Sequence, residues 1–482
     1  MYLGLDVGTS GVKALLVDAD GRTVGSADAT YDVTNPAPGW SEQDPADWTG
    51  GVAQALAQLR SAHGSAFAAI KGLSLSGHMH GAVLVDAEGA VLRPCILWND
   101  TRSHAEAAEM DAAKAARDLS GNIVFPGFTA PKLAWVARHE PEVFAKVARV
   151  MLPKDYVVWW LTGRYATEMS DAAGTAWLDV GKRDWSDTLL SLGGMTRAQM
   201  PDLLEGTDVV GPVQSARADL GLPQDAQVVA GGADNAVAAC GVGALGEGDG
   251  FVSLGTSGVV LAGRDRYAPM AANAVHTFCH AVPGRWYQMG VVLAATDSMN
   301  WLARITGQSA GALSDALGTK VQAPGGAKFY PYLSGERTPH NDAQVRGGLT
   351  GIDIASTPQD LTRAVMTGVS FALRDSLEAL RGTGAQLDSA LAIGGGTRSP
   401  YWTQLLATVL NLPLERPDEG AFGAALGAAR IAICGVTGAA PAQVMSKPPI
   451  TDVIQPDAAH VAAYDDAYAA FAAAYPTLKA MP

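Results

Sequence analysis

Short apolar runs with a period of two residues open the chain and predict β-strands. Residues 2–7 and 12–18 form the first two runs, and a third lies around Val24. The turns between them are rich in glycine and aspartate, so the three runs are expected to form an antiparallel meander. Further strand-like runs cover residues 70–75, 82–85, 226–230 and 391–393.

Segments with helical signals separate these strands. Asp44 followed by Pro45 is typical of a helix N-terminus, because the aspartate side chain caps free N–H groups and proline fits the first turn. This helix is expected to run through Leu59. Further helices are expected over residues 104–116, 131–138, 156–161, 236–243 and 358–380, and from about residue 400. Strand hairpins that alternate with helices predict an α/β fold.

One strand–turn–strand unit occurs twice. The sequence Gly-Thr-Ser-Gly-Val stands at residues 8–12 and again at residues 255–259, each time between two strand-like runs. A chain of 482 residues is also too long for one ordinary hydrophobic core. We therefore predict two domains, residues 1–247 and 248–482, with a hinge in the glycine-rich segment 246–250.

Composition narrows the class of ligand. The formal net charge is −14, and Lys and Arg form no cluster of the kind that a nucleic acid or an anionic membrane requires. The four cysteines are scattered, which fits reduced thiols better than disulfides or a zinc site. The first residues lack the pattern of a secretory signal, and the apolar stretch 421–436 is too short to span a membrane. We expect a cytoplasmic protein with a small ligand.

The two Gly-Thr-Ser turns are candidate phosphate sites. Turns rich in glycine and hydroxyl groups direct N–H and O–H groups into one concavity, which suits a polyphosphate. Two such turns that face each other are expected to hold the β- and γ-phosphates of ATP. The residues concerned are Gly8, Thr9 and Ser10 in the first turn, and Gly255, Thr256 and Ser257 in the second.

The two turns differ in the residue that lies two positions before the glycine. This residue is Asp6 in the first copy and Ser253 in the second. Only the first turn offers a carboxylate to a cation, so we expect Asp6 to hold Mg²⁺, mostly through water. In the alternative interpretation Asp6 only caps the turn.

A run of glycines follows a strand in the second half of the chain. Within residues 394–397, Gly395 and Gly396 are candidate contacts for the adenosine side of a nucleotide, because glycine lets a ligand approach the backbone closely. A triple glycine is about as often only a tight turn. The chain contains no GxxxxGK[ST] segment, which disfavours a P-loop site.

Asp234 is the candidate catalytic base. It lies between a buried strand and a helix, where an open α/β sheet exposes reactive groups to a cleft. A carboxylate there is able to take the proton of a sugar hydroxyl as the bond to phosphorus forms. The alternative is a helix N-cap, a position that aspartate often occupies.

Two histidines flank a methionine at the end of a strand. If the strand continues, alternation places His78 and His80 on one face. A metal pair is disfavoured, because no third ligand stands nearby in the sequence. Hydrogen bonding of the histidines to a polyhydroxy ligand is the favoured interpretation, and Met79 is either a ligand contact or core packing.

A second candidate sugar contact combines an aromatic face with amide and carboxylate groups. Trp98, Asn99 and Asp100 supply these groups in sequence. Alternatively, Trp98 belongs to the core and Asp100 forms a solvated ion pair with Arg102.

These segments resemble the FGGY family of carbohydrate kinases over nearly the whole chain. Long matches in the same order are highly specific. The resemblance implies two ribonuclease-H-like domains of the actin and hexokinase type, with ATP and Mg²⁺ in the cleft between them. The matched segments are residues 6–13, 39–45, 79–81, 96–100, 126–133, 152–156, 170–175, 232–235 and 332–340.

The resemblance also implies roles for individual residues. Asp234 is implied as the proton acceptor, Met79 and His80 as sugar contacts, and Asp6 as the group that serves phosphate and metal. Lys13 lies in the matched phosphate segment and is expected beside the nucleotide. The motifs are most similar to those of family members that phosphorylate D-xylulose, so D-xylulose 5-phosphate is the expected product. The family's habit suggests a homodimer.

Three positions depart from this pattern. His78 replaces a usual glutamine, Ala233 replaces a usual glycine, and Thr367 stands where an acid normally closes the family's second signature. Because His78 adjoins the expected sugar pocket, a kinase for another ketopentose or a pentitol is the main alternative. An actin- or chaperone-like ATPase without a sugar substrate is a more distant one, since the sequence shows no appended peptide-binding domain.

Overall fold

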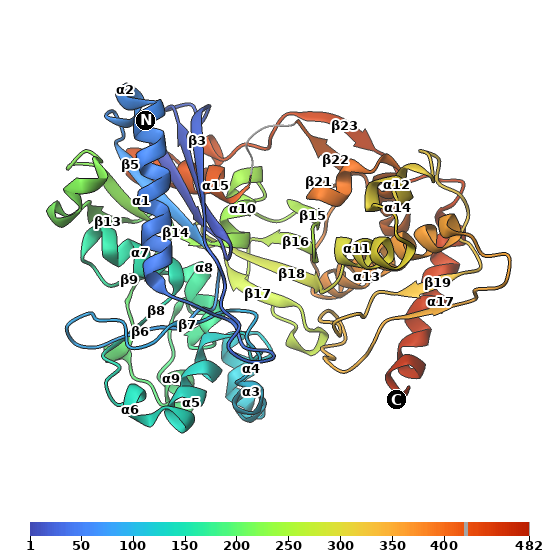
Figure 1. Ribbon diagram of the computed structural model, residues 1–482, viewed down its shortest axis with the longest axis horizontal. Helices are drawn as coiled ribbons and strands as arrows, with labels where there is room; N and C mark the ends of the chain where they lie inside the picture. Colours follow the sequence, from blue (N-terminus) through green and yellow to red (C-terminus); the bar gives the residue numbers. More distant parts are fainter. Residues whose placement is uncertain (419–422, 482) are drawn as a thin grey trace.

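The computed structural model describes residues 1–418 and 423–481. Two mixed sheets dominate its two halves, which lie side by side along the longest axis (Figure 1). The first sheet contains, in spatial order, β13 (Val209–Pro212), β14 (Gln227–Ala233), β5 (Gly72–Gly77), β1 (Tyr2–Val7), β2 (Gly11–Val17) and β3 (Thr23–Thr30). The second contains β17 (His276–Cys279), β18 (Trp286–Val292), β16 (Gly258–Arg264), β15 (Gly250–Leu254), β21 (Ala390–Ile393), β22 (Leu414–Pro417) and β23 (Ile450–Ile454).

The central strands of the two sheets pair in the same way. β1 is antiparallel to β2 and parallel to β5, and β15 is antiparallel to β16 and parallel to β21. Each Gly-Thr-Ser segment forms the turn of its antiparallel pair. The structure confirms the duplicated unit and the α/β fold class that the sequence predicts.

Helices cover both faces of the first sheet. Leu3 and Leu5 of β1 pack in one cluster with Trp48 of α1 (Pro45–Ala62), while Tyr2 packs in another cluster with Ala429. This segregation follows from the alternation of side chains along a strand. Asp44 caps α1 as predicted, because its side chain accepts the N–H of Ala46 (2.9 Å).

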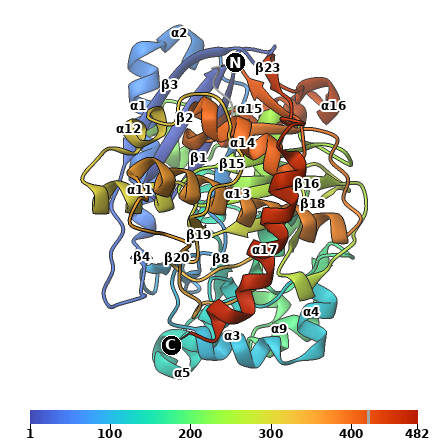
Figure 2. The same cartoon turned by 90° about the vertical axis from the view of Figure 1, so that its right-hand side faces the viewer.

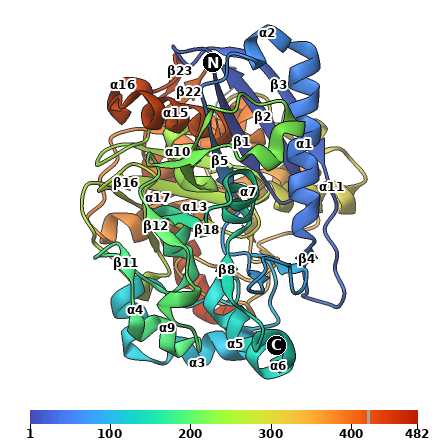
Figure 3. The same cartoon turned by 90° about the vertical axis from the view of Figure 1, so that its left-hand side faces the viewer.

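The helix on the second face comes from far along the chain. α15 (Ala424–Thr437) packs against β1, β5 and β14, and against α10 (Asp234–Val242), beside the first sheet (Figures 1 and 3). It overlaps the apolar stretch 421–436, of which residues 421 and 422 lie outside the described residues. The domain boundary at residue 247 stays a prediction. Through α15, residues near the C-terminal end of the chain pack against the first sheet.

The contact of α15 with its neighbours depends on glycine. A Cβ added to Gly427 would lie 1.9 Å from the carbonyl oxygen of Val237, and one added to Gly4 would lie 1.9 Å from that of Ala425. Both oxygens belong to backbone, which has little freedom to move. The helices and the sheet therefore approach each other at a distance that excludes larger side chains.

We expect Gly427→Ala to lower the free energy of unfolding by about 1–3 kcal/mol, because the added methyl group overpacks a rigid contact. Denaturant unfolding followed by circular dichroism measures the change. The matched control is Gly50→Ala in α1, where an added Cβ meets no atom within 4 Å. A loss of stability in the control as large as that in Gly427→Ala would contradict the explanation.

A layer of helices covers the second sheet. α13 (Pro358–Gly382) packs against β16 and β18, and α14 (Pro400–Leu410) and α17 (Val461–Lys479) pack against α13 (Figure 2). Thr357 and Asp360 form a capping box at the start of α13, with Pro358 in the first turn. These features explain why the predicted boundaries of α13 are close to the observed ones.

Most other predicted helices are confirmed, and one is wrong. The segment 104–116 forms two helices, α3 (His104–Asp111) and α4 (Lys114–Ser120), because the chain turns at residues 112–113. The expected helices at 131–138 and 156–161 are α5 (Thr129–His139) and α7 (Pro153–Thr162). In the described part of the chain, no helix combines the length and apolar character that crossing a membrane requires.

Smaller elements connect these layers. Pairs of short strands are β4 (Glu42–Gln43) with β7 (Cys95–Ile96), β6 (Val83–Val85) with β8 (Arg149–Met151), β9 (Ala166–Glu168) with β12 (Asp202–Leu204), β10 (Leu178–Asp179) with β11 (Asp184–Trp185), and β19 (Lys328–Tyr330) with β20 (Gly348–Thr350). The remaining helices are α2 (Gly64–Phe67), α6 (Pro141–Phe144), α8 (Met169–Ala172), α9 (Asp187–Leu192), α11 (Thr296–Thr306), α12 (Ala310–Asp315) and α16 (Pro441–Val444), and the 3₁₀ helices are η1 (Ala173–Thr175), η2 (Arg197–Gln199), η3 (Ser215–Leu220), η4 (Ala271–Asn273) and η5 (Gly395–Arg398).

Candidate active site

Side chains from other segments hold the turn between β1 and β2. Tyr31 donates its hydroxyl hydrogen to the Gly8 carbonyl (2.7 Å), and Gln43 donates an amide hydrogen to the Thr9 carbonyl (2.7 Å). Carbonyl oxygens repel an anion, and these two are occupied. Ser10 is exposed on the open side of the turn. This arrangement suits the predicted binding of phosphate.

The start of α11 holds the turn between β15 and β16. The Thr296 N–H donates to the Gly255 carbonyl (2.9 Å), and the Ala295 N–H donates to the Thr256 carbonyl (2.9 Å). Ser257 is exposed, as Ser10 is in the first turn. The two turns therefore have occupied carbonyl groups and exposed serines in common.

A hollow of about 320 Å³ lies beside the second turn. Gly395 borders it with no atom within 4 Å of an added Cβ, whereas a Cβ on Gly396 would meet the side chain of Leu254 at 2.5 Å. Gly395 thus leaves space for a ligand, and Gly396 is required for packing. The residues that line the hollow include Thr296, Met299, Asn300, Ala310, Ser314, Gly395, Gly396, Arg398 and Trp402.

The candidate acids lie at one edge of the first sheet. Asp6 on β1 is opposite Ser76 on β5, and Ser76 is in turn opposite Gly232 on β14. Asp234 follows two residues later, so the carboxyl ends of three parallel strands bring Asp6 and Asp234 together. Lys13 is exposed and pairs with Asp6 across the β1–β2 hairpin.

Asp234 has one oxygen occupied and one free. Its Oδ1 accepts the N–H of Asn235 (2.6 Å) and the side-chain amide of Asn235 (2.8 Å), while Oδ2 accepts no hydrogen bond from any described residue. Burial and the charge of Asp6 raise the pKa of Asp234 to about 6, although the bonds from Asn235 oppose the shift. The N-cap of α10 is Ala233, so the alternative reading of Asp234 as the N-cap is wrong.

A buried group of charged side chains lies near the segment that carries Asp234. Lys154 Nζ lies 2.6 Å from Asp155, 3.6 Å from Asp171 and 3.9 Å from Glu168, and all four side chains are at most 1% exposed. Burial alone would lower the pKa of Lys154, but the three carboxylates outweigh it and raise that pKa. Burial raises the pKa of Asp171. The single buried ammonium group of Lys154 thus compensates the negative charge of these carboxylates.

Ser170 connects this group of charges to the candidate base. Its hydroxyl donates to Glu168 (2.8 Å) and accepts the N–H of Ala233 (3.0 Å), the residue before Asp234. The sequence matches included this region without assigning it a role. The sequence does mark this region, because the charged residues Lys154 and Asp155 interrupt an otherwise apolar segment.

Met79 and His80 follow β5 at the same edge of the sheet. His80 has a φ of 71°, which few residues other than glycine adopt, and its Nδ1 lies 2.6 Å from the Gly174 carbonyl. The ring of His80 stacks on Phe128, with centroids 4.7 Å apart. Lys132 donates to the His80 carbonyl (2.7 Å), which fixes the unusual backbone.

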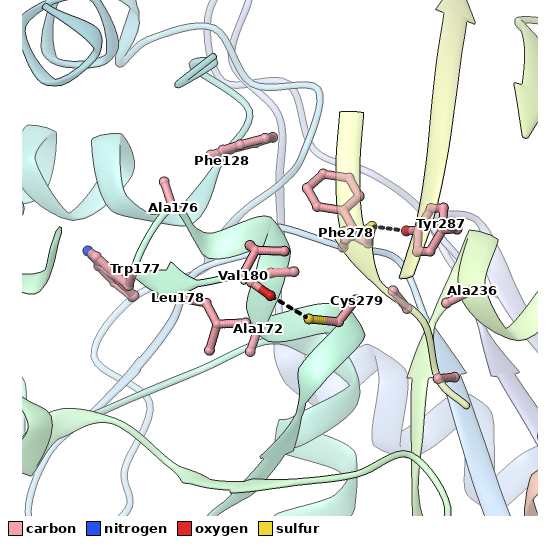
Figure 4. Close-up of a cluster of buried hydrophobic side chains, with 14 of the residues drawn as sticks. Phe128, Ala172, Ala176, Trp177, Leu178, Val180, Ala236, Phe278, Cys279 and Tyr287 are labelled. Atoms are coloured by element: carbon pink, nitrogen blue, oxygen red, sulfur yellow. Dashed lines mark hydrogen bonds between the residues drawn. The ribbon is translucent and has the colours of Figure 1, made fainter. Parts of the chain in front are cut away.

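Aromatic side chains form a wall next to these two residues. The hydroxyl of Tyr287 is directed at the sulfur of Met79 (4.0 Å), and Phe278 stands between Tyr287 and Phe128 (Figure 4). Phe278 and Tyr287 belong to the second sheet, whereas Met79 and Phe128 belong to the first half. The wall is therefore built from both halves. The sequence does not predict this wall, because its members are scattered along the chain.

His78 lies apart from His80. β5 ends at Gly77, so the expected alternation of a continuing strand is wrong. The ring of His78 packs edge-on against Trp48 of α1, with centroids 5.4 Å apart. Burial lowers the pKa of His78 to about 3, and neither ring nitrogen has a partner among the described residues.

The three residues of segment 98–100 differ in exposure, and only two of them are accessible to a sugar. Trp98 is 48% exposed and donates its indole hydrogen to Thr9 Oγ1 (3.0 Å), and Asn99 is exposed as well. Asp100, in contrast, is buried and accepts hydrogen bonds from Arg102 (2.7 Å) and from the Ser41 N–H (2.6 Å). The expected solvated ion pair is wrong, because both side chains are at most 1% exposed. The expected sugar contact of Asp100 is also replaced by a structural role, since both its oxygens are engaged.

The donor set around Asp6 suits a weakly coordinated cation. Over residues 1–418 and 423–481, no group of three or more His, Cys, Asp or Glu side chains gathers as a metal cage. Asp6 supplies one carboxylate at the sheet edge, on β1 opposite Ser76. Mg²⁺ keeps several waters and takes further oxygens from phosphate, so this sparse set fits Mg²⁺ better than a structural metal.

Family models match both halves of the chain. The model described as the FGGY family of carbohydrate kinases, N-terminal domain, matches residues 1–241. The model for the C-terminal domain of the same family matches residues 250–436.

Individual relatives match the chain from end to end. It is 43% identical over 467 residues to the xylulose kinase of Escherichia coli (strain K12), covering 96% of each chain. It is 44% identical over 482 residues to the xylulose kinase of Klebsiella pneumoniae, covering 99% of each. The crystal structure of a xyloylose kinase from Brucella ovis has a TM-score of 0.98 and 51% identity, with 100% of both chains covered.

Proposed function

The chain belongs to the FGGY family of carbohydrate kinases, and we propose that it transfers the terminal phosphoryl group of ATP to D-xylulose, forming D-xylulose 5-phosphate. The observation that carries this proposal is the free oxygen of Asp234 at the sheet edge, where the charges of Asp234 and Asp6 interact and the charge of Asp234 also acts on Tyr287 of the aromatic wall. Full-length relatives that act on xylulose support the substrate.

The nucleotide is proposed to lie across the two Gly-Thr-Ser turns. Its adenosine occupies the hollow beside Gly395, and its β- and γ-phosphates reach the exposed serines Ser10 and Ser257. Lys13 lies next to the first turn and adds positive charge there. Hydroxyl and N–H donors held in place by the fold stabilise the charge that develops on phosphate during transfer.

Asp234 is proposed to act as the general base. Its Oδ2 takes the proton of the sugar's terminal hydroxyl while that oxygen bonds to the γ-phosphorus and the bond from phosphorus to the leaving oxygen of ADP breaks. Met79 and His80 contact the sugar, and the exposed Trp98 and Asn99 are further proposed sugar contacts. Closure about residues 246–250 excludes water, which otherwise competes as the phosphoryl acceptor.

Asp6 is the residue that would hold Mg²⁺, mostly through water. When bound, the ion neutralises charge on the phosphates. The buried cysteines and the use of ATP fit a cytoplasmic enzyme, and a homodimer stays a prediction that light scattering in solution tests.

The pKa of Asp234 predicts a pH dependence. Only the ionised carboxylate accepts a proton, and its pKa is raised to about 6. We therefore expect kcat/KM for the sugar to be constant above pH 7 and to fall about tenfold per unit well below pH 6. Rate measurements between pH 5 and 8, with circular dichroism at each pH, test this. A constant kcat/KM down to pH 5 would contradict it.

A panel of sugars tests the proposed substrate. ADP formation is measured with a coupled assay for D-xylulose, other ketopentoses and pentitols, and we expect the highest kcat/KM with D-xylulose. A clearly higher value for another sugar would transfer the proposal to that substrate. If no sugar stimulates ADP formation, an ATPase without a sugar substrate becomes the better explanation.

A further inference from the structure

Arg337 brings a positive charge from the second half of the chain to the aromatic wall. It lies in the loop between β19 and β20. Its guanidinium carbon stands 3.9 Å from the centre of the Phe125 ring, which precedes α5 in the first half. The side chain therefore spans the boundary between the halves, at a point where the sequence predicts no function.

The protein gives this guanidinium few partners. Its Nη1 lies 3.3 Å from Nε2 of His276, and within the described residues no carboxylate forms an ion pair with it. The neighbouring Glu336 is directed elsewhere, because its Oε1 accepts the N–H groups of Leu293 (3.0 Å) and of Arg337 itself (2.8 Å). A guanidinium has five hydrogen-bond donors and no acceptor. Most of its donors are therefore available to a ligand that presents oxygen.

Burial makes this lack of partners costly. The side chain is only partly exposed, and burial lowers the pKa of Arg337 to about 10. A charge removed from water without a carboxylate partner destabilises the folded protein. A bound ligand with acceptor oxygens restores the lost hydrogen bonds, and this gives the position a functional explanation.

The site lies next to the sugar contact His80. Phe128 stacks on His80, and its ring centroid is 6.0 Å from that of His276, which contacts Arg337. After burial, the charge of Arg337 is the next cause that lowers the pKa of His276, and it also contributes to lowering that of His80. Both imidazoles are thus neutral, so Arg337 supplies positive charge beside His276.

Asp234 and Arg337 act on different positions of the β17–β18 pair. In the β17–β18 pair, Phe278 faces Tyr287 and His276 faces Met289. The charge of Asp234 raises the pKa of Tyr287, whereas Arg337 contacts His276, two residues further along β17. Two residues of a strand span about 7 Å, which is on the scale of a five-carbon sugar. A sugar whose terminal hydroxyl meets Asp234 therefore extends its other end toward Arg337.

We propose that Arg337 donates hydrogen bonds to the carbonyl and hydroxyl oxygens of the sugar at the end opposite the phosphorylated hydroxyl. This inference rests on the proposed function and extends it: the second half of the chain contributes to sugar recognition as well as to nucleotide binding. A sugar held by His80 from one half and by Arg337 from the other also favours the closed arrangement of the halves.

The variant Arg337→Gln tests the contact. Loss of charge-assisted hydrogen bonds is expected to raise KM for D-xylulose about 10- to 100-fold, with KM for ATP within about twofold of the wild-type value. Arg337→Lys retains the charge but not the planar fork, so an intermediate KM is expected. The matched control is Arg346→Gln in the same loop, an exposed arginine that donates to the carbonyl groups of Ala343 and Val345 in that loop.

Several outcomes would overturn the assignment. One is an unchanged KM for the sugar in Arg337→Gln. Another is a rise in KM for ATP as large as the rise in KM for the sugar, which would indicate a phosphate contact or a general structural role. A structure of the wild-type protein with the sugar bound provides a test that does not depend on the variants folding, since a sugar oxygen must lie within about 3.2 Å of the guanidinium. If the wild-type enzyme prefers another sugar, the same comparison is made with that sugar. If it phosphorylates none, both proposals fail.

Discussion

Replacing Asp234 by asparagine is expected to reduce kcat for sugar phosphorylation about 10³-fold while the protein stays folded. The amide retains the size of the side chain but is unable to accept the hydroxyl proton, and general bases contribute about 10²- to 10⁴-fold to rates. The hydrogen bonds from Asn235 to Oδ1 place the carboxylate, and the amide oxygen can still accept them. The loss should therefore lie in kcat more than in KM for either substrate.

Two further measurements make this result specific. The residual activity of Asp234→Asn should lose the decrease below pH 6, because the group that titrates is gone. Asp187→Asn is the matched control, since Asp187 is also the first residue of a helix but is exposed and forms an ion pair with Arg197. Turnover within tenfold of wild type in Asp234→Asn would rule out its assignment as the base.

Replacing Lys154 by methionine is expected to lower the free energy of unfolding by about 3–5 kcal/mol, the largest effect on stability that the structure predicts. Methionine fills the space of the lysine stem, so the change isolates the charge. Without the ammonium group, Asp155, Glu168 and Asp171 remain buried with no cation among them. Removing one partner of a buried ion pair typically costs this amount, because the remaining charges are uncompensated.

Urea unfolding at pH 7.5, followed by tryptophan fluorescence, measures this change. The matched control is Lys182→Met. This change breaks the ion pair of Lys182 with Asp179, in which the lysine side chain is 78% exposed. Exposed pairs contribute roughly 0–1 kcal/mol, so the control should unfold nearly as the wild type does. A loss below about 1 kcal/mol in Lys154→Met would show that the three carboxylates do not depend on the lysine.

Local sequence signals predicted the parts of the fold and of the site that local interactions determine. The Gly-Thr-Ser turns, the cap at Asp44 and the start of α13 at Pro358 depend on residues a few positions apart, and each is found where the sequence indicates it. The strand–helix junction at Asp234 is of the same kind. Its proximity to Asp6, in contrast, depends on the parallel pairing of β1, β5 and β14, which the local sequence does not indicate.

Contacts between distant segments were not predictable in this way. The packing of α15 on β1 and the stacking of Arg337 on Phe125 join parts of the chain that no periodicity relates. Asp100 was assigned to the sugar because an acid beside tryptophan and asparagine has that chemistry. Its burial by Arg102 and Ser41 depends on a loop about 60 residues earlier, and the local sequence carries no sign of it.

The origin of α15 also has a consequence for how the protein is made. The first sheet buries one of its faces against residues 424–437, which are synthesised long after β1 and β5. Domains commonly fold as they leave the ribosome, with the N-terminal one first. Here the first sheet has an uncovered apolar face until nearly the whole polypeptide has been translated. Completion of its core is therefore a late event, and a nascent chain halted before residue 424 should need chaperones to stay in solution.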